Sequence, residues 1–349
     1  MHKQMTMHTV RATPDIAVVK TKLLDRYVLP KVAMVLILVS SAAGAWLTLR
    51  GVGAASPDLV IAKWAYFVAL STLLGGGLWG AFFARRRYAE QDIDATPEFL
   101  ELEFDRFATI QRYAAGIMVA AGGYTLTQYI LPFGSHYDTW YNWLAGALAL
   151  LWLALAGVIA AGQRGLLNKG EGWLERRQRW LKASVGVALL GLLATAALDV
   201  VPYHGNDIGN ILARWVHLSA FGVWFGGAVW NVFVAVPAAR KSLGFETVFA
   251  AAAQLDQFRR VVRFALPLVV LTGIFQSYSL IGANLPALLT LPVGVLILAK
   301  VLLIVTLFGI FLACPMWRAC SPIAGVCDIT DIDPTPKAEP QSPPVARQA

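Results

Sequence analysis

Charged residues are scarce in this chain and are missing from long stretches of it. Asp, Glu, Lys and Arg make up 14% of its 349 residues, whereas a soluble globular domain carries roughly a quarter. Residues 113–135, 140–162 and 264–290 contain none of the four. About 20 apolar residues cross the hydrocarbon core of a bilayer, and the backbone must be helical there. The composition excludes a soluble domain and predicts an all-α polytopic membrane protein surrounded by lipid.

Residue types that carry chemistry are also few. The three cysteines, Cys314, Cys320 and Cys327, all lie near the C-terminal end, which argues against a disulfide framework. The chain has five histidines, few for a bis-histidine haem site. It has no P-loop, HExxH motif or Ser-His-Asp set, so we expect no enzyme activity. The net charge of +8 follows the loops rather than one basic face, and we expect no nucleic-acid partner.

The apolar segments predict eight transmembrane helices. These helices are expected at 31–50, 61–83, 112–132, 140–162, 182–201, 212–236, 262–283 and 291–314. Lys and Arg gather in the N-terminal segment and in the second, fourth and sixth loops, whereas loops three and seven have none. Because Lys and Arg favour the cytoplasmic side, both termini are predicted to be cytoplasmic.

The chain repeats itself at an offset of 151 residues. KWAYFVALSTLLGGGLWG begins at Lys63 and RWVHLSAFGVWFGGAVWN begins at Arg214, and the same register aligns Asp105 with Asp256 in a polar loop. The pattern predicts two tandem four-helix repeats, which are parallel because each has an even number of spans. The expected parts are a cytoplasmic segment at 1–30, repeats at 31–162 and 182–314, a cytoplasmic linker at 163–181 and a Pro-rich disordered tail at 315–349.

Two ionisable residues are predicted inside the membrane, and both belong to the second repeat. His217 lies near the outer end of the sixth span, where the first repeat has Tyr66, and Lys300 lies in the eighth span, where it has Ala149. Intramembrane ionisable residues often mark a cavity or a pathway. The alternatives are a histidine bonded to a neighbouring helix and a structural lysine. Lys300 is expected to be neutral or to pair with a carboxylate such as Asp199.

A metal site is a further hypothesis. Imidazole and carboxylate ligands suit copper or zinc, and the outer side is predicted to carry His136, His204, His217, Asp138, Asp199 and Asp207. No pair has the spacing of a metal motif, so ordinary loop polarity is the alternative. On the cytoplasmic side, thiolates suit Cu(I), and the candidate ligands there are Cys314, Cys320 and Met316.

Small residues predict close helix packing in both repeats. Glycines let two helix backbones approach each other within a membrane. The glycines expected to do so are Gly75, Gly76, Gly222, Gly226 and Gly227.

The second repeat resembles the copper-resistance D (CopD) membrane family. The segment RWVHLSAFGVWFGGAVW resembles its helix with a His, a Trp and paired glycines, and RFALPLVVLTGIFQSYSLIG resembles its Thr-Gly helix. Gly294-x5-Lys300 resembles the final Gly…Lys helix, although the Tyr expected before it is missing from 290–294. The resemblance covers about 211–314.

This resemblance implies copper transport or copper homeostasis in the inner membrane of a bacterium. His217 would receive the ion near the outer face, and a periplasmic copper-binding protein is an implied partner. Lys300, Trp224 and Asp199 would line or gate the cavity. Two alternatives stay open: a haem- or quinone-binding anchor of an electron-transfer complex, and a scaffold without a ligand.

Overall fold

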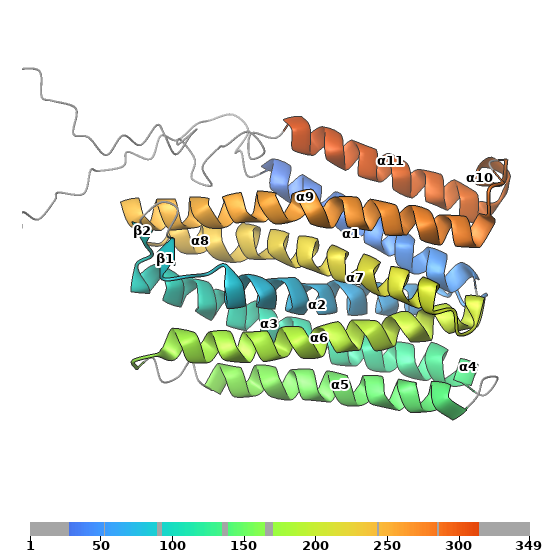
Figure 1. Ribbon diagram of the computed structural model, residues 1–349, viewed down its shortest axis with the longest axis horizontal. Coiled ribbons are helices and arrows are strands. Elements are labelled where there is room, and N and C mark those ends of the chain that lie inside the picture. The colour runs from blue at the N-terminus through green and yellow to red at the C-terminus, as the bar shows by residue number, and fades with distance from the viewer. Residues whose placement is uncertain are drawn as a thin grey trace, which may run out of the picture.

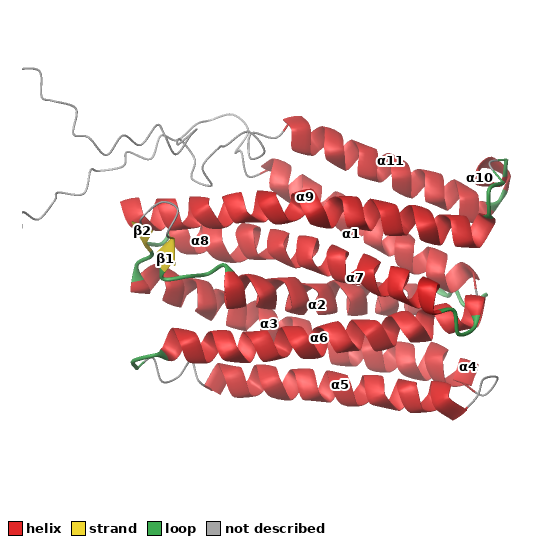
Figure 2. Ribbon diagram, viewed as in Figure 1, coloured by secondary structure: helices red, strands yellow, loops and turns green. Residues whose placement is uncertain are grey.

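The computed structural model describes most of the chain between Val28 and Ala313. The described ranges are 28–51, 53–88, 93–134, 139–164, 170–242, 244–284 and 286–313. Within them almost every residue is helical, and Figure 2 shows loops at the two ends of the bundle. Two strands of two residues each, β1 (Arg87–Tyr88) and β2 (Ile93–Asp94), pair antiparallel. The predicted fold class, all-α, is therefore confirmed for the described residues.

Helices run side by side along the long axis of the molecule (Figure 1). The first half of the chain forms α1 (Val28–Gly51), α2 (Pro57–Phe82), α3 (Pro97–Thr125), a π-helical turn η1 (Leu126–Ile130), α4 (Leu131–Gly134) and α5 (Thr139–Arg164). The second half forms α6 (Trp173–His204), α7 (Ile208–Val229), a second π-helical turn η2 (Trp230–Ala235), α8 (Val236–Ala239), α9 (Phe245–Ile281), α10 (Ala287–Thr290) and α11 (Pro292–Ala313). The start of α1 and the end of α11 lie at the same end of the bundle, opposite α10.

Five of the described helical segments are long and apolar enough to cross a membrane. They are Pro57–Phe82, Thr139–Arg164, Trp173–Pro202, Ile208–Ala239 and Glu246–Ile281. Shorter apolar helices occupy Lys31–Leu47 and Pro292–Leu307. These lengths and compositions are those of a multi-pass membrane protein.

Local sequence signals explain where several helices begin. Helices α2 and α3 both begin with Pro. The first N–H groups of a helix have no partner within the helix, so Pro, which has no N–H, costs no hydrogen bond there. The Thr96 hydroxyl caps α3 by accepting the N–H of Phe99. Asp207 caps α7 in the same way, with its carboxylate 3.2 Å from the backbone N of Asn210. Asp207, a candidate for the outer metal site, therefore has a structural partner.

Two helices begin well before the spans predicted for them. Helix α6 begins at Trp173, inside the predicted linker 163–181. Helix α9 runs without a break from Phe245 to Ile281, whereas the predicted span is 262–283. Trp173 and Leu181 are buried in one core cluster with Phe104 and Trp230, which gives the first turns of α6 an apolar surface to pack on.

Helices α2 and α7 form the centre of the bundle. Helix α3 packs on α2 and α9 packs on α7, while α5 packs along α6 and α11 packs along α1. Three pairs of residues separated by 151 positions meet between the halves. A Cβ built on Gly75 would lie 2.7 Å from the Cα of Gly226. The remaining pairs are Thr96 with Thr247, 3.4 Å between hydroxyls, and Gln254 with Glu103, 3.1 Å from Nε2 to Oε2.

Candidate functional site

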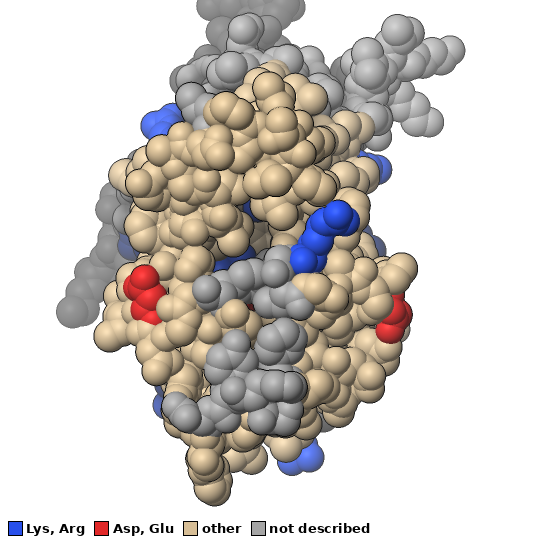
Figure 3. Space-filling model, turned by 90° about the vertical axis from the view of Figure 1, so that its right-hand side faces the viewer, with Lys and Arg blue, Asp and Glu red and all other residues tan. Residues whose placement is uncertain are grey.

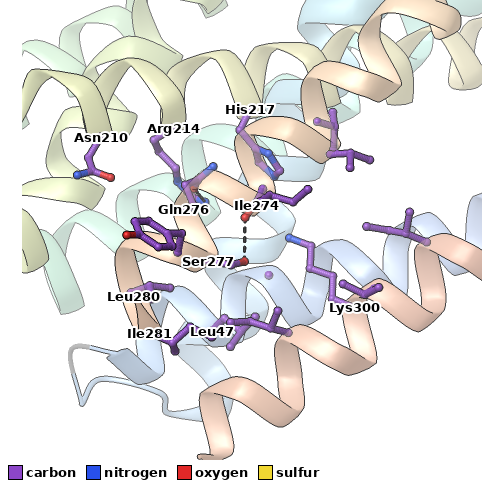
Figure 4. A pocket seen from close by; sticks show the side chains of 18 of the residues that line it. Leu47, Asn210, Arg214, His217, Ile274, Gln276, Ser277, Leu280, Ile281 and Lys300 are labelled. Carbon is purple, nitrogen blue, oxygen red and sulfur yellow. Dashed lines mark hydrogen bonds between the residues drawn. The ribbon is translucent and has the colours of Figure 1, made fainter. Parts of the chain in front are cut away.

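A cavity of about 720 Å³ lies among α1, α6, α7, α9 and α11, towards the α10 end of the bundle. Its walls are mainly apolar, and Figure 4 shows Arg214, His217 and Lys300 among the residues that line it. Figure 3 views the α10 end and shows a hollow in which Lys or Arg atoms are visible below the surrounding residues. The cavity therefore combines an apolar wall with a cationic interior.

His217 projects from α7 into this cavity and is 8% exposed. Its Nδ1 lies 2.9 Å from the hydroxyl of Thr272 on α9, and that hydroxyl donates to the carbonyl of Leu268. With the hydroxyl proton on that carbonyl, the hydroxyl oxygen can accept a hydrogen bond from Nδ1–H, and this tautomer leaves Nε2 with its lone pair. The ring packs against Gly273, where a Cβ would lie 3.5 Å from Cε1, an ordinary van der Waals distance.

Lys300 reaches from α11 across the cavity towards α1. A Cβ built on Gly44 would lie 3.4 Å from its Nζ, so the absence of a side chain at Gly44 leaves room for the ammonium. Among the residues that the structure describes, no carboxylate forms an ion pair with Lys300. The lysine and His217 thus enter the same cavity from two different helices.

A buried ion-pair network borders the cavity and involves two cations that the sequence did not single out. The carboxylate of Asp199 lies 2.6 Å from Lys63 Nζ and 2.9 Å from Arg214 NH2. The side chains of Lys63, Asp199 and Arg214 are 2%, 5% and 14% exposed. The expectation that Asp199 pairs with Lys300 is therefore wrong: both oxygens of that carboxylate already bind other cations. The signal that could have identified them is the repeat, because Lys63 and Arg214 are 151 residues apart.

The matching place in the first half of the chain is filled. The hydroxyl of Tyr66, which aligns with His217, lies 2.7 Å from Thr195 Oγ1 and accepts a hydrogen bond from the indole of Trp152 at 3.1 Å. At the offset of 151, Gly44 is equivalent to Thr195 and Leu303 is equivalent to Trp152. Gly44 lines the cavity, whereas the larger Thr195 bonds Tyr66 in the packed core of the first half.

The other predicted site residues are distributed as follows. His204 lines the cavity at the end of α6. Trp224 is buried in a core cluster with Phe225 and Val262 and does not line the cavity. His136, Cys314 and Cys320 lie outside the described residues, as do Asp138, Met316 and Cys327.

The charges around the cavity bear directly on copper. Within the described ranges, no group of three or more His, Cys, Asp or Glu residues is placed to hold a metal ion. His217 offers one nitrogen, and Lys300 and Arg214 line the same space. Two nearby cations repel a bare metal ion in a medium of low dielectric constant. The donor set therefore suits copper that brings other ligands with it better than a bare ion held by protein ligands alone.

Comparison with known families agrees with the motifs of the second half. Residues 252–321 match the family model described as Copper resistance protein D, CopD. The matched segment contains Thr272, Gly273 and Lys300, whereas His217 precedes it. No curated protein and no solved structure matches the chain at a significant level. The family match therefore supports a similarity to the copper-resistance D family over residues 252–321, and the apolar helices are those of a multi-pass membrane protein.

Proposed function

We propose that this protein takes up copper through the cavity at the α10 end and moves it across the inner membrane of a bacterium. The observation that carries the proposal is the orientation of His217. Thr272 bonds Nδ1, and in the tautomer with its proton on Nδ1 the other ring nitrogen, Nε2, would be the ligand atom. A neutral imidazole is a good ligand for copper. His204 at the end of α6 lies where an incoming ion would pass, and a periplasmic copper-binding protein is the proposed donor.

We also propose that the chain crosses the membrane eight times as two parallel four-helix repeats. In this arrangement α1, α2, α3 and α5 form the first repeat, and α6, α7, α9 and α11 form the second. The meeting of Gly75 with Gly226 and of Glu103 with Gln254 supports it, because residues near a two-fold axis face their own equivalents. The basic loops then place both termini in the cytoplasm and the cavity on the outer side.

Cysteine labelling tests this topology. In a cysteine-free background, a membrane-impermeant maleimide should label Ser56→Cys, in the α1–α2 loop, in intact spheroplasts. Lys241→Cys, in the turn after α8, should react only after permeabilisation. Both positions are exposed, so access to the reagent depends on the side of the membrane. Labelling of both positions from the same side would contradict the proposed topology, in which five spans, an odd number, lie between them.

Copper content tests the role of His217. Protein purified in mild detergent and loaded with copper should hold about one copper per chain, and His217→Ala should lose it because a single imidazole is removed from a sparse donor set. Elemental analysis with an absorption spectrum measures this. Tyr66→Phe, at the equivalent position of the first half, is the matched control and should keep its copper.

Other outcomes of that measurement would lead to different functions. A Soret band in the wild-type spectrum would support a haem-binding anchor of an electron-transfer complex. A protein with neither copper nor haem after loading would support the third alternative, a scaffold that binds no ligand. Copper retained by His217→Ala would place the ion elsewhere in the chain.

A further inference from the structure

The cavity holds more positive than negative charge. Arg214 and Lys300 line it together with Asp199, and Lys63 lies beside it on the same carboxylate. That carboxylate already binds Lys63 and Arg214. A buried cation is costly unless a counter-charge lies beside it. The arrangement therefore has room for an additional negative charge next to Lys300.

The shape of the cavity restricts what could bring that charge. Its volume of about 720 Å³ lies within the range of small-molecule sites. Ile274, Ile297, Val301 and Ile304 on α9 and α11 form part of an apolar wall beside Lys300. A small inorganic anion would leave most of this wall without contacts, whereas an apolar chain or ring would cover it.

We propose that the cavity binds an amphiphilic organic anion, with a single carboxylate or phosphate head on an apolar body. The head lies between Lys300 and Arg214, where Gln276 already bonds the guanidinium at 3.3 Å from NH1 to Oε1. The body lies along α9 and α11. This inference goes beyond copper uptake and does not depend on it, because the anion is held by the cations rather than by His217. Its source is either an acidic lipid of the bilayer or a solute from the aqueous side.

The first test uses a soluble probe in the absence of copper. Wild-type protein in nanodiscs of zwitterionic lipid, with a chelator present, is titrated calorimetrically with 4-phenylbutyrate and with the uncharged 4-phenylbutanol. The carboxylate should bind at least about tenfold more tightly than the alcohol, since charge-assisted hydrogen bonds to the two cations hold its head. Equal binding of the two probes would overturn the proposal, because the cations would then contribute nothing.

Variants connect the binding to the named groups. Lys300→Met keeps an unbranched side chain of similar length and removes its charge, and it should weaken 4-phenylbutyrate binding about tenfold or more. Lys300→Arg keeps the charge and should restore most of the affinity. Lys182→Met, far along α6 from the cavity, is the matched control and should bind as the wild type does. Unchanged affinity in Lys300→Met would contradict the proposal, and thermal unfolding of each variant checks that it is folded.

Native mass spectrometry distinguishes the two sources. A fatty acid or acidic phospholipid retained by wild-type protein and lost from Lys300→Met identifies the bilayer as the source. A protein that carries no lipid but binds 4-phenylbutyrate takes its ligand from water. A protein that neither retains an anion nor binds the probe would overturn the inference. Copper binding is measured separately, so the two proposals can fail independently. A wild-type protein that binds the anion but no copper would refute only the proposal of copper uptake.

Discussion

Replacing Asp199 with Asn should reduce the free energy of unfolding by about 3–5 kcal/mol, because it leaves two buried cations without their counter-ion. Lys63 is almost completely enclosed, and Arg214 is mostly so. The asparagine keeps the size of the side chain and removes only the charge, so loss of packing would not account for the effect. Unfolding in mixed micelles of increasing denaturing detergent, followed by circular dichroism, measures the change.

A double variant separates this charge effect from other causes. Adding Lys63→Met to Asp199→Asn removes one of the two cations that lack a counter-ion and should recover part of the lost stability. Asp256→Asn is the matched control, because its contact with Arg260 is about half exposed on both sides and contributes under about 1 kcal/mol. A double variant as unstable as the single one would show that Lys63 and Asp199 do not act as a pair.

The variant Gly226→Ala should destabilise the protein by about 3 kcal/mol, at the upper end of the usual cost of overpacking. A Cβ at this position would lie 2.5 Å from the Cα of Gly75 and 2.6 Å from the carbonyl oxygen of Ser71. Both are backbone atoms, which cannot rotate away as the end of a side chain does. Helices α2 and α7 would have to separate, although they form the centre of the bundle.

The control for this substitution is a helical glycine in open surroundings. A Cβ on Gly191 in α6 would meet no atom within 4 Å, and Gly191→Ala should be neutral or slightly stabilising because alanine favours the helix. The same detergent titration compares the two variants. If Gly226→Ala unfolds at the wild-type midpoint, the close approach of α2 and α7 is not required for stability.

Much of the fold follows from patterns that the bilayer imposes on a sequence. Charge-free stretches identify helices because lipid offers no partner for a free backbone N–H or C=O. Their ends are harder to place, since a helix can continue into water when a core is available there. Trp173 and the first turns of α6 pack in such a core, which a count of apolar residues does not reveal.

The candidate site was predictable only in part. The repeat drew attention to His217 and Lys300 as residues without equivalents in the first half, and the structure places both on one cavity. The role of Gly44 in lining the cavity becomes apparent only when Thr195 and Trp152 are seen to bond Tyr66 in the equivalent space of the first half. The repeat marks Lys63 and Arg214 as equivalent residues, but their pairing with Asp199 depends on how distant helices pack, which the sequence alone does not reveal.

The hydrogen bond between Gln254 and Glu103 has a consequence for how such a bundle can evolve. Two separate copies of one four-helix protein, related by a two-fold axis, must bring identical side chains together on that axis: two acids or two amides. Covalent fusion of the copies removes this constraint, because each position can then mutate alone. An acid facing an amide, both fully enclosed, is a combination available only to the fused chain. Joining the halves thus permits an asymmetric centre as well as a fixed stoichiometry.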